Sequence, residues 1–230
     1  MPGSGMADPA LDLPILSVNV GRPALLGEAG GRPVLSAIRK SPLRGDSVVL
    51  GKTNLAGDAQ ADLSVHGGVD KAVYAYPAAH WPAWQAEQGL VAGPASFGEN
   101  LTLGGALEDA IRIGDVFAWG EARLAVSQPR QPCFKLALLL GRPDVGAAMV
   151  KSARCGFYLR VLEPAEVPLR DAGLRRVETD ADAPSIRTLF RALFDPKQSA
   201  DALERLAATS GLADAFRQDL LARARARRTR

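Results

Sequence analysis

The chain has 230 residues, of which 47% are hydrophobic and 23% charged, so it is long enough to form one large globular domain with a real core. Only two cysteines occur, which excludes a disulfide-built scaffold and favours a reducing compartment. The formal net charge of +3 comes mainly from residues 217–230, which hold six arginines and one aspartate; we expect a solvated helix end there rather than a surface for nucleic acid.

The first segment, residues 1–14, begins with a run rich in Pro and Gly, and we predict that it is disordered. It has no basic region followed by an apolar run, so it does not resemble a secretory signal. No apolar stretch of the chain is long enough to span a bilayer. We therefore expect a cytoplasmic protein that does not associate with membranes.

Residues 15–178 alternate short runs of β-forming residues with clusters of Gly, Pro and Asp. This punctuation is typical of a β-barrel or sandwich, so we predict a mainly β domain interrupted by a few helices. Residues 115–127 form a predicted hairpin that turns near Gly120 and Glu121. The predicted strands are 17–20, 47–50, 72–76, 115–119, 122–127 and 156–162, and the predicted helices are 80–88 and 143–151.

Residues 179–230 have a different pattern and are predicted to form a small three-helix domain. Apolar residues from Ile186 to Phe194 recur at helical spacing and form one stripe. Two further helical patterns cover 199–209 and 212–226, and Ser210-Gly211 between them is a typical helix stop. Three helices of this size are marginal alone, so we expect them to pack together or on the β domain.

The stretch from Ser127 to Lys135 carries the strongest chemical signal. Two prolines stiffen this loop, and Arg130 and Lys135 would stabilise the thiolate form of Cys133, which attacks electrophiles or binds soft metals. Most lone cysteines are small core residues, but this charged setting favours a functional Cys133. Cys155, at the start of a predicted strand, is expected to be a core residue.

Three other clusters could contribute to a ligand site, two of them by binding an anionic group and the one with Glu99 and Asn100 by orienting polar groups of the ligand or a neighbouring loop. Paired glycines beside a histidine let backbone N–H groups approach a phosphate closely, and a lysine nearby adds charge. A tight turn with a hydrogen-bonded histidine is the structural alternative. The candidates are Asp58 and Gln60, then His66, Gly67, Gly68 and Lys71; Glu99 and Asn100; and the basic turn that contains Lys40 and Ser41.

Other site types fit the sequence poorly. Two histidines and two distant cysteines cannot assemble a common zinc site. Cys133 and His66 could form a nucleophilic pair, but their spacing does not establish that they meet. No phosphate-binding glycine motif is present at the spacing that nucleotide folds require.

Six motifs in this order resemble the MOSC domain, the C-terminal domain of molybdenum cofactor sulfurases. They are Lys40-Ser41-Pro42, Gly57-Asp58-x-Gln60-Ala61-Asp62, Val65-His66-Gly67-Gly68-x-Asp70-Lys71, Phe97-Gly98-Glu99-Asn100-Leu101, Gly114-Asp115 and Gln128-Pro129-Arg130-x-Pro132-Cys133-x-Lys135. The resemblance spans roughly residues 15–178. The C-terminal helices are similar to the extension of a bacterial subgroup associated with resistance to N-hydroxylated bases such as 6-hydroxylaminopurine.

The resemblance implies a β-barrel of short strands that binds a molybdopterin-type molybdenum cofactor, with Cys133 as the molybdenum ligand and catalytic residue. It implies reduction of a small N-hydroxylated substrate, with electrons from a separate reductase, a flavoprotein or an iron–sulfur protein, because no flavin or haem motif is evident here. The residues implied to hold the cofactor are Lys40, Ser41, Asp58, Gln60, His66, Gly67, Gly68, Lys71, Asn100, Gln128, Arg130 and Lys135.

Two alternatives stay open at this point. Cys133 could carry a persulfide in a sulfur-transfer protein, although the chain has no pyridoxal-phosphate desulfurase domain to load it. The chain could also be a non-catalytic carrier of the cofactor. The oligomeric state is equally open, and a homodimer is one alternative.

Overall fold

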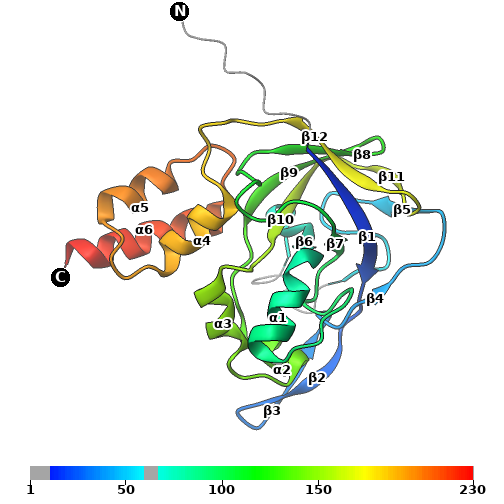
Figure 1. The fold of residues 1–230 in the computed structure, drawn as a ribbon, viewed down its shortest axis with the longest axis horizontal. Coiled ribbons are helices and arrows are strands. Elements are labelled where there is room, and N and C mark those ends of the chain that lie inside the picture. Colours follow the sequence, from blue (N-terminus) through cyan, green and yellow to red (C-terminus); the bar gives the residue numbers. More distant parts are fainter. Residues whose placement is uncertain (1–10, 60–66, 230) are drawn as a thin grey trace, which may run out of the picture.

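A closed β-barrel forms the centre of the computed structural model, which describes residues 11–59 and 67–229. Its seven strands are β1 (Asp12–Val20), β6 (Val73–Pro77), β7 (Leu101–Leu103), β8 (Val116–Trp119), β9 (Ala122–Pro129), β10 (Phe157–Glu163) and β12 (Gly173–Glu178). They are hydrogen-bonded in the order β12–β8–β9–β10–β6–β7–β1, and β1 pairs back with β12 to close the barrel (Figure 1). Within the barrel β6 and β7 are parallel, and the other neighbours are antiparallel. The predicted barrel is confirmed.

Shorter strands extend the barrel. β4 (Ser41–Pro42) pairs with the end of β1, β5 (Ser47–Leu50) pairs with β11 (Ala165–Pro168), and β2 (Ala24–Ala29) forms a hairpin with β3 (Arg32–Ser36). The hairpin of β2 and β3 was not expected from the sequence. Strand β1 already pairs with β12 from Asp12 to Pro14, so the barrel begins before residue 15 and includes part of the segment that we predicted to be disordered.

Short helices flank the barrel. They are η1 (Val69–Lys71), η2 (Ala78–His80), α1 (Trp81–Gln88), α2 (Phe134–Leu140) and α3 (Val145–Ser152). Of these, α1, α2 and α3 lie together below the barrel in the view of Figure 1. The predicted helices 80–88 and 143–151 correspond to α1 and α3. Helix α2 was not predicted, because its seven residues, all apolar except Lys135, are too few to display helical periodicity. It begins directly after Cys133.

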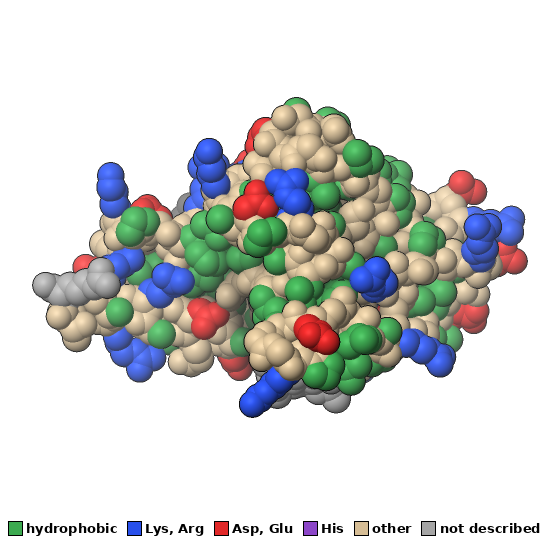
Figure 2. All heavy atoms as spheres, turned by 90° about the horizontal axis from the view of Figure 1, so that it is seen from below, with side chains coloured by type: hydrophobic (Ala, Val, Ile, Leu, Met, Phe, Trp, Pro, Cys, Tyr) green, Lys and Arg blue, Asp and Glu red, His purple; other side chains and the backbone are tan. Residues whose placement is uncertain are grey.

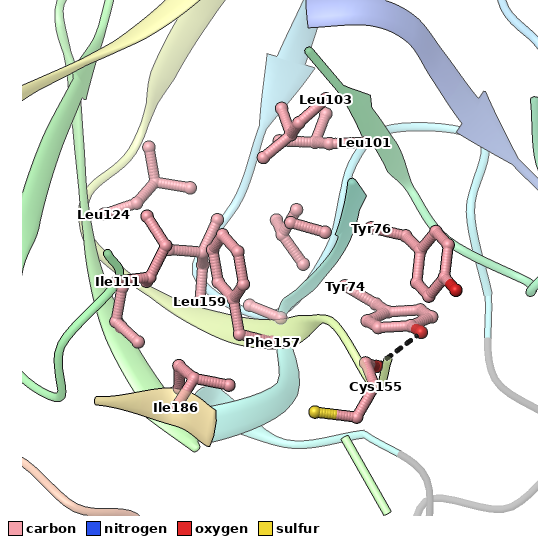
Figure 3. Packing of buried hydrophobic residues seen from close by; sticks show 14 of the residues in the cluster. Tyr74, Tyr76, Leu101, Leu103, Ile111, Leu124, Cys155, Phe157, Leu159 and Ile186 are labelled. Atoms are coloured by element: carbon pink, nitrogen blue, oxygen red, sulfur yellow. Dashed lines mark hydrogen bonds between the residues drawn. The ribbon is translucent and has the colours of Figure 1, made fainter. Parts of the chain in front are cut away.

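Three C-terminal helices pack on one side of the barrel (Figure 1): α4 (Ile186–Phe194), α5 (Ala200–Ala207) and α6 (Asp214–Arg228). The predicted apolar stripe of α4 is buried, and Ser185 caps the helix by accepting a hydrogen bond from the Thr188 amide. The amide of Ile186 donates to the carbonyl of Ile111 at 2.8 Å. Figure 3 shows the Ile186 side chain in one cluster with Ile111 and Phe157 of the barrel. The helices and the barrel therefore share a hydrophobic core.

The surface carries charges of both signs. On the face in Figure 2, most Lys and Arg side chains stand apart, with hydrophobic and acidic side chains between them. No helix within the described part of the chain has the length and apolar character that crossing a bilayer requires.

Candidate active site around Cys133

A cavity of about 320 Å³ lies beside the loop that carries Cys133. This volume is within the usual range for sites that bind small molecules or cofactors. Its wall combines segments that are far apart in sequence. They are the loops after β3 and β5, the region of η1, the start of β6, the loop before β7, the end of β9, the Cys133 loop, the start of α2, β10 and α6. The residues that line it are Ser36, Ala37, Ile38, Lys40, Asp58, Ala59, Gly67, Lys71, Tyr74, Phe97, Gly98, Asn100, Gln128, Arg130, Gln131, Pro132, Cys133, Lys135, Tyr158, Ala215, Phe216 and Asp219.

Cys133 is held between a strand and a helix. Strand β9 ends at Pro129, and the next amide, of Arg130, donates to the carbonyl of Gly156 on the neighbouring segment at 3.3 Å. Cys133 itself has an extended backbone and is the residue that precedes α2, whose Leu136 amide donates to the Cys133 carbonyl. Both ends of the loop are thus anchored, and the half-buried thiol reaches the cavity.

The thiol of Cys133 contacts the buried guanidinium of Arg130. Its Nη2 lies 4.0 Å from Cys133 Sγ, its Nη1 lies 3.6 Å from Met149 Sδ, and the group stands 5.4 Å from the centre of the Tyr74 ring. Burial alone would lower the pKa of Arg130, but the neighbouring Tyr74 and Cys133 groups raise it, so the cation persists. Within residues 11–59 and 67–229, Arg130 has no carboxylate partner. A buried cation without a fixed counter-ion favours an anionic ligand.

Two tyrosines complete the wall around this guanidinium. The rings of Tyr74 and Tyr158 lie 5.2 Å apart, and burial raises the pKa of both phenols, so they stay neutral at pH 7. The Tyr74 hydroxyl donates to the Cys155 carbonyl at 2.9 Å (Figure 3). Cys155 is fully buried, and burial raises the pKa of its thiol well above the ordinary value. It is therefore an unreactive core residue, as the sequence suggested.

Lys40 and Asp58 form a buried ion pair at the cavity wall. Burial lowers the pKa of Lys40, and the adjacent Asp58 carboxylate opposes that effect. The same carboxylate accepts hydrogen bonds from the Gly21 amide at 2.8 Å and from Asn100 Nδ2 at 2.9 Å. Asp58 is consequently occupied by protein partners, and it positions Lys40 at the cavity.

The loop before β7 is braced by its own polar side chains. Asn100 accepts from the Tyr74 amide and donates to the Asn19 carbonyl, so it links three segments of the barrel. Glu99 accepts from the amides of Ala95 and Phe97 and is buried, and this burial raises its pKa. Asn100 lines the cavity, but its amide is largely used within the fold.

The structure brings nine of the predicted site residues to this cavity: Lys40, Asp58, Gly67, Lys71, Asn100, Gln128, Arg130, Cys133 and Lys135. Ser41 and Gly68 do not line it. Ser41 is exposed on β4 directly after Lys40, and successive residues of an extended chain point in opposite directions. Gln60 and His66 lie outside the described residues.

Several wall residues were not among the predicted site residues. Tyr158 and Phe216 have the appearance of ordinary core positions in the sequence, which offers no signal for them, whereas Phe97 belongs to one of the six motifs. Asp219 does offer one, because it is the single acidic residue among the six arginines of residues 217–230. Gln131 joins it there, since Gln131 Nε2 donates to Asp219 Oδ2 at 2.7 Å.

A second polar cluster lies in the core and was also missed by the sequence analysis. His80 Nε2 lies 2.7 Å from Glu108 Oε2, and Glu108 also accepts from the Gly156 amide at 2.8 Å. Burial would raise the pKa of Glu108, but the contacts with His80 and Gly156 outweigh it and hold the pKa below its usual value. This cluster supports Gly156, whose carbonyl receives the Arg130 amide.

Comparisons with known proteins agree with this fold. A family model described as the MOSC domain matches residues 62–172. The protein YflK from Bacillus subtilis (strain 168) is 38% identical over 207 residues, which are 90% of this chain and 92% of YflK. The crystal structure of YiiM from Geobacillus stearothermophilus is 33% identical with a TM-score of 0.76, and the match covers 92% of this chain and 99% of that one.

A third relative is much longer. A protein from Gibberella moniliformis (strain M3125 / FGSC 7600) that is named "Reductase" is 34% identical over 157 residues, which are 66% of this chain and 27% of that protein. The family model and the match with YflK, which covers nearly the full length of both chains, extend the resemblance found in the motifs to most of the sequence. The chain belongs to the MOSC domain family.

Proposed function

We propose that this protein binds a molybdenum cofactor through Cys133 and reduces N-hydroxylated compounds. The observation that carries the proposal is the pairing of a cavity-lining thiol with a buried cation, Arg130, that has no carboxylate partner in the described part of the chain. A soft thiolate suits molybdenum, and an anionic cofactor would supply the missing negative charge. The name of the Gibberella relative, "Reductase", supports reduction of the substrate rather than its oxidation.

The residues around the cavity fit such a group. The buried Gln128 Oε1 has no hydrogen-bond partner among the described residues and could receive an N–H donor of a pterin ring. Lys71 and Lys135 add positive charge to the same wall, where Lys40 also lies, paired with Asp58. No cluster of three His, Cys, Asp or Glu residues occurs in residues 11–59 and 67–229, so a metal here would depend on Cys133 and on ligands of the cofactor itself.

In the proposed reaction, an N–OH compound takes up two electrons and two protons, its N–O bond breaks, and an amine and water leave. When bound, the molybdenum cofactor would supply the two-electron redox centre. The chain would hold that centre through Cys133 Sγ, and Arg130 would offset its negative charge. The phenols of Tyr74 and Tyr158, which are neutral, would line the cavity without repelling the negatively charged cofactor. Electrons would come from a separate flavoprotein or iron–sulfur reductase.

Replacement of each cysteine tests this proposal. Protein made in a host that synthesises the cofactor should contain molybdenum, and Cys133→Ala should lose both the metal and the reduction of 6-hydroxylaminopurine by a chemically reduced dye. The control, Cys155→Ala, should keep both and lose about 1 kcal/mol of unfolding free energy, because it only truncates a core side chain. Elemental analysis, activity and circular dichroism are the measurements.

Full metal content and activity in Cys133→Ala would overturn the proposal. Mass spectrometry of the wild-type protein adds a distinct outcome: an extra sulfur on Cys133 without molybdenum would favour the sulfur-transfer alternative.

A further inference from the structure

Helix α6 brings a carboxylate to the cavity that contains Cys133. Ala215, Phe216 and Asp219 line this cavity, and their spacing places them on one face of the helix. The rest of the described wall comes from residues 36–158. One face of α6 is therefore part of the site.

The start of α6 is fixed to the strand that leads to Cys133. The Ala213 amide donates to the Ser127 carbonyl of β9 at 2.9 Å, and Phe216 and Leu220 are fully buried. Arg217 Nη2 donates to the Leu212 carbonyl at 3.1 Å, which holds the turn before the helix. Asp219 thus has a set position relative to the Cys133 loop.

Asp219 differs from the other acidic residue of the wall. Both carboxylate oxygens of Asp58 already accept hydrogen bonds from the protein. Asp219 accepts one, from Gln131 Nε2 to its Oδ2, and it has no ion pair within the part of the chain that the structure describes. Its second oxygen is available to a ligand, and the Gln131 contact orients the group.

A second observation also points to a ligand with N–H donors. Gln128 is 3% exposed and lines the cavity, and its buried Oε1 has no partner among the described residues. A carboxylate repels an anionic group, so Asp219 suits a different part of the bound molecules from the one that Arg130 attracts. The wall thus combines an anion-binding element with an acceptor of N–H donors.

We propose that Asp219, oriented by Gln131, determines substrate specificity by accepting a hydrogen bond from an N–H group beside the reacting N–OH. Such an N–H group is present in N-hydroxylated amidines and in the imino form of 6-hydroxylaminopurine, where the carbon that bears the N–OH nitrogen also bears a second nitrogen. This inference rests on the proposed reduction. The recognition of the N–H group itself does not require the reaction, and it can be measured separately.

The test uses the cofactor-loaded protein and two matched variants. Asp219→Asn removes an exposed carboxylate that lines the cavity and keeps the shape of the side chain. Asp214→Asn removes an exposed carboxylate that does not line the cavity, from the first turn of the same helix. Calorimetry with benzamidine, a reduced amidine, should give about 10-fold weaker binding to Asp219→Asn than to the wild type, because a hydrogen bond to a charged acceptor is lost. Asp214→Asn should bind as the wild type does.

Kinetics with benzamidoxime and its N,N-dimethyl analogue provide the second readout. For benzamidoxime, Asp219→Asn should raise KM about 10-fold and leave kcat nearly unchanged. The wild-type protein should have a lower kcat/KM for the analogue than for benzamidoxime, because the analogue lacks the N–H donors. In Asp219→Asn the two kcat/KM values should differ less.

The outcomes separate the two proposals. Equal benzamidine affinity in the wild type and Asp219→Asn, or no measurable affinity in the wild type, overturns the role of Asp219 even if benzamidoxime is reduced. A selective loss of affinity in Asp219→Asn, together with no reduction of benzamidoxime by the wild type, supports the recognition of N–H donors and overturns the proposed reduction.

Discussion

Arg130 and Glu108 are both buried charged residues, yet their surroundings differ. Glu108 is fully buried and has His80 at 2.7 Å, the Gly156 amide at 2.8 Å and Arg187 at 3.7 Å as partners. Arg130 has a thioether, a thiol and an aromatic ring beside it. A charge with a complete set of partners maintains the fold, whereas a charge without one is available for a ligand.

The lowered pKa of Glu108 leads to a prediction about acid stability. Between that pKa and the ordinary value of 4.5, the folded protein holds fewer protons on Glu108 than the unfolded chain does. The free energy of unfolding should therefore rise with pH across this interval, and this contribution is lost as the pH falls through the lowered pKa. Glu108→Gln should lack this rise and lose on the order of 2 kcal/mol at pH 7. Urea unfolding at a series of pH values measures both effects.

Glu99→Gln is the control for this experiment. Burial raises the pKa of Glu99, so its contribution to stability is full below 4.5 and is lost as the pH rises through the raised pKa. Removal of Glu99 should change the pH dependence of the free energy of unfolding in the opposite sense from removal of Glu108. If the free energy of unfolding rose equally steeply with pH in Glu108→Gln and in the wild type below pH 4.5, Glu108 would not be the source of the rise.

Among the secondary-structure elements, α6 has two parts with different contacts. Its first turns carry the cavity residues Ala215, Phe216 and Asp219. Its last turns contact the other helices: Arg223 stands 5.5 Å from the centre of the Phe194 ring, and Arg228 pairs with acidic residues of α5. Arg223 and Arg228 are exposed, as expected for a helix end in solvent, and they also contact the neighbouring helices.

Deletion of residues 223–230 should leave the proposed reductase activity unchanged, because the remaining part of α6 keeps Phe216 and Leu220 in the core. The thermal midpoint should fall, since the deletion removes the contacts with Phe194 and α5 together with the buried Ala224. Steady-state kinetics with a natural electron donor and differential scanning calorimetry are the measurements. A large loss of electron transfer with an unchanged midpoint would indicate that the tail docks the reductase.

In the whole molecule, the helices and the barrel are joined by hydrogen bonds and by a common core. The Ala213 amide donates to a carbonyl of strand β9, and the Ile186 amide donates to a carbonyl of the segment between β7 and β8. From that same segment, the Arg112 guanidinium donates to the Ala183 carbonyl at 2.7 Å. The hydrophobic cluster includes Phe157 of β10 together with Phe190 of α4. Such continuity favours unfolding of the two parts as one unit.

Urea unfolding should accordingly show a single transition. The three tryptophans all lie before residue 120, so their fluorescence reports on the barrel, whereas ellipticity at about 222 nm reports largely on the C-terminal helices. We expect the two signals to change with the same midpoint. Loss of ellipticity at a clearly lower urea concentration would instead mean that residues 179–230 unfold as an independent domain.

Much of the architecture could be predicted from local patterns. Regular alternation of short β-forming runs with turn residues indicates a barrel without any knowledge of strand order, because each strand is specified by its neighbours in sequence. The apolar stripe of α4 and the stop at Gly211 are equally local. Helix α2 and the hairpin of β2 and β3 escaped prediction, since their seven-residue and shorter runs lack a clear period and depend on packing for their stability.

The amino-acid sequence by itself determined the family, through six motifs in order, and it singled out Cys133 through the prolines and cations of one short loop. Only the tertiary structure decided how that thiol is surrounded: that Arg130 is buried without a carboxylate partner among the described residues, and that Asp219, 88 residues beyond Gln131, is hydrogen-bonded to it at the cavity. The physical reason is that a motif depends on local chemistry, whereas burial and the pairing of charges depend on how distant segments pack.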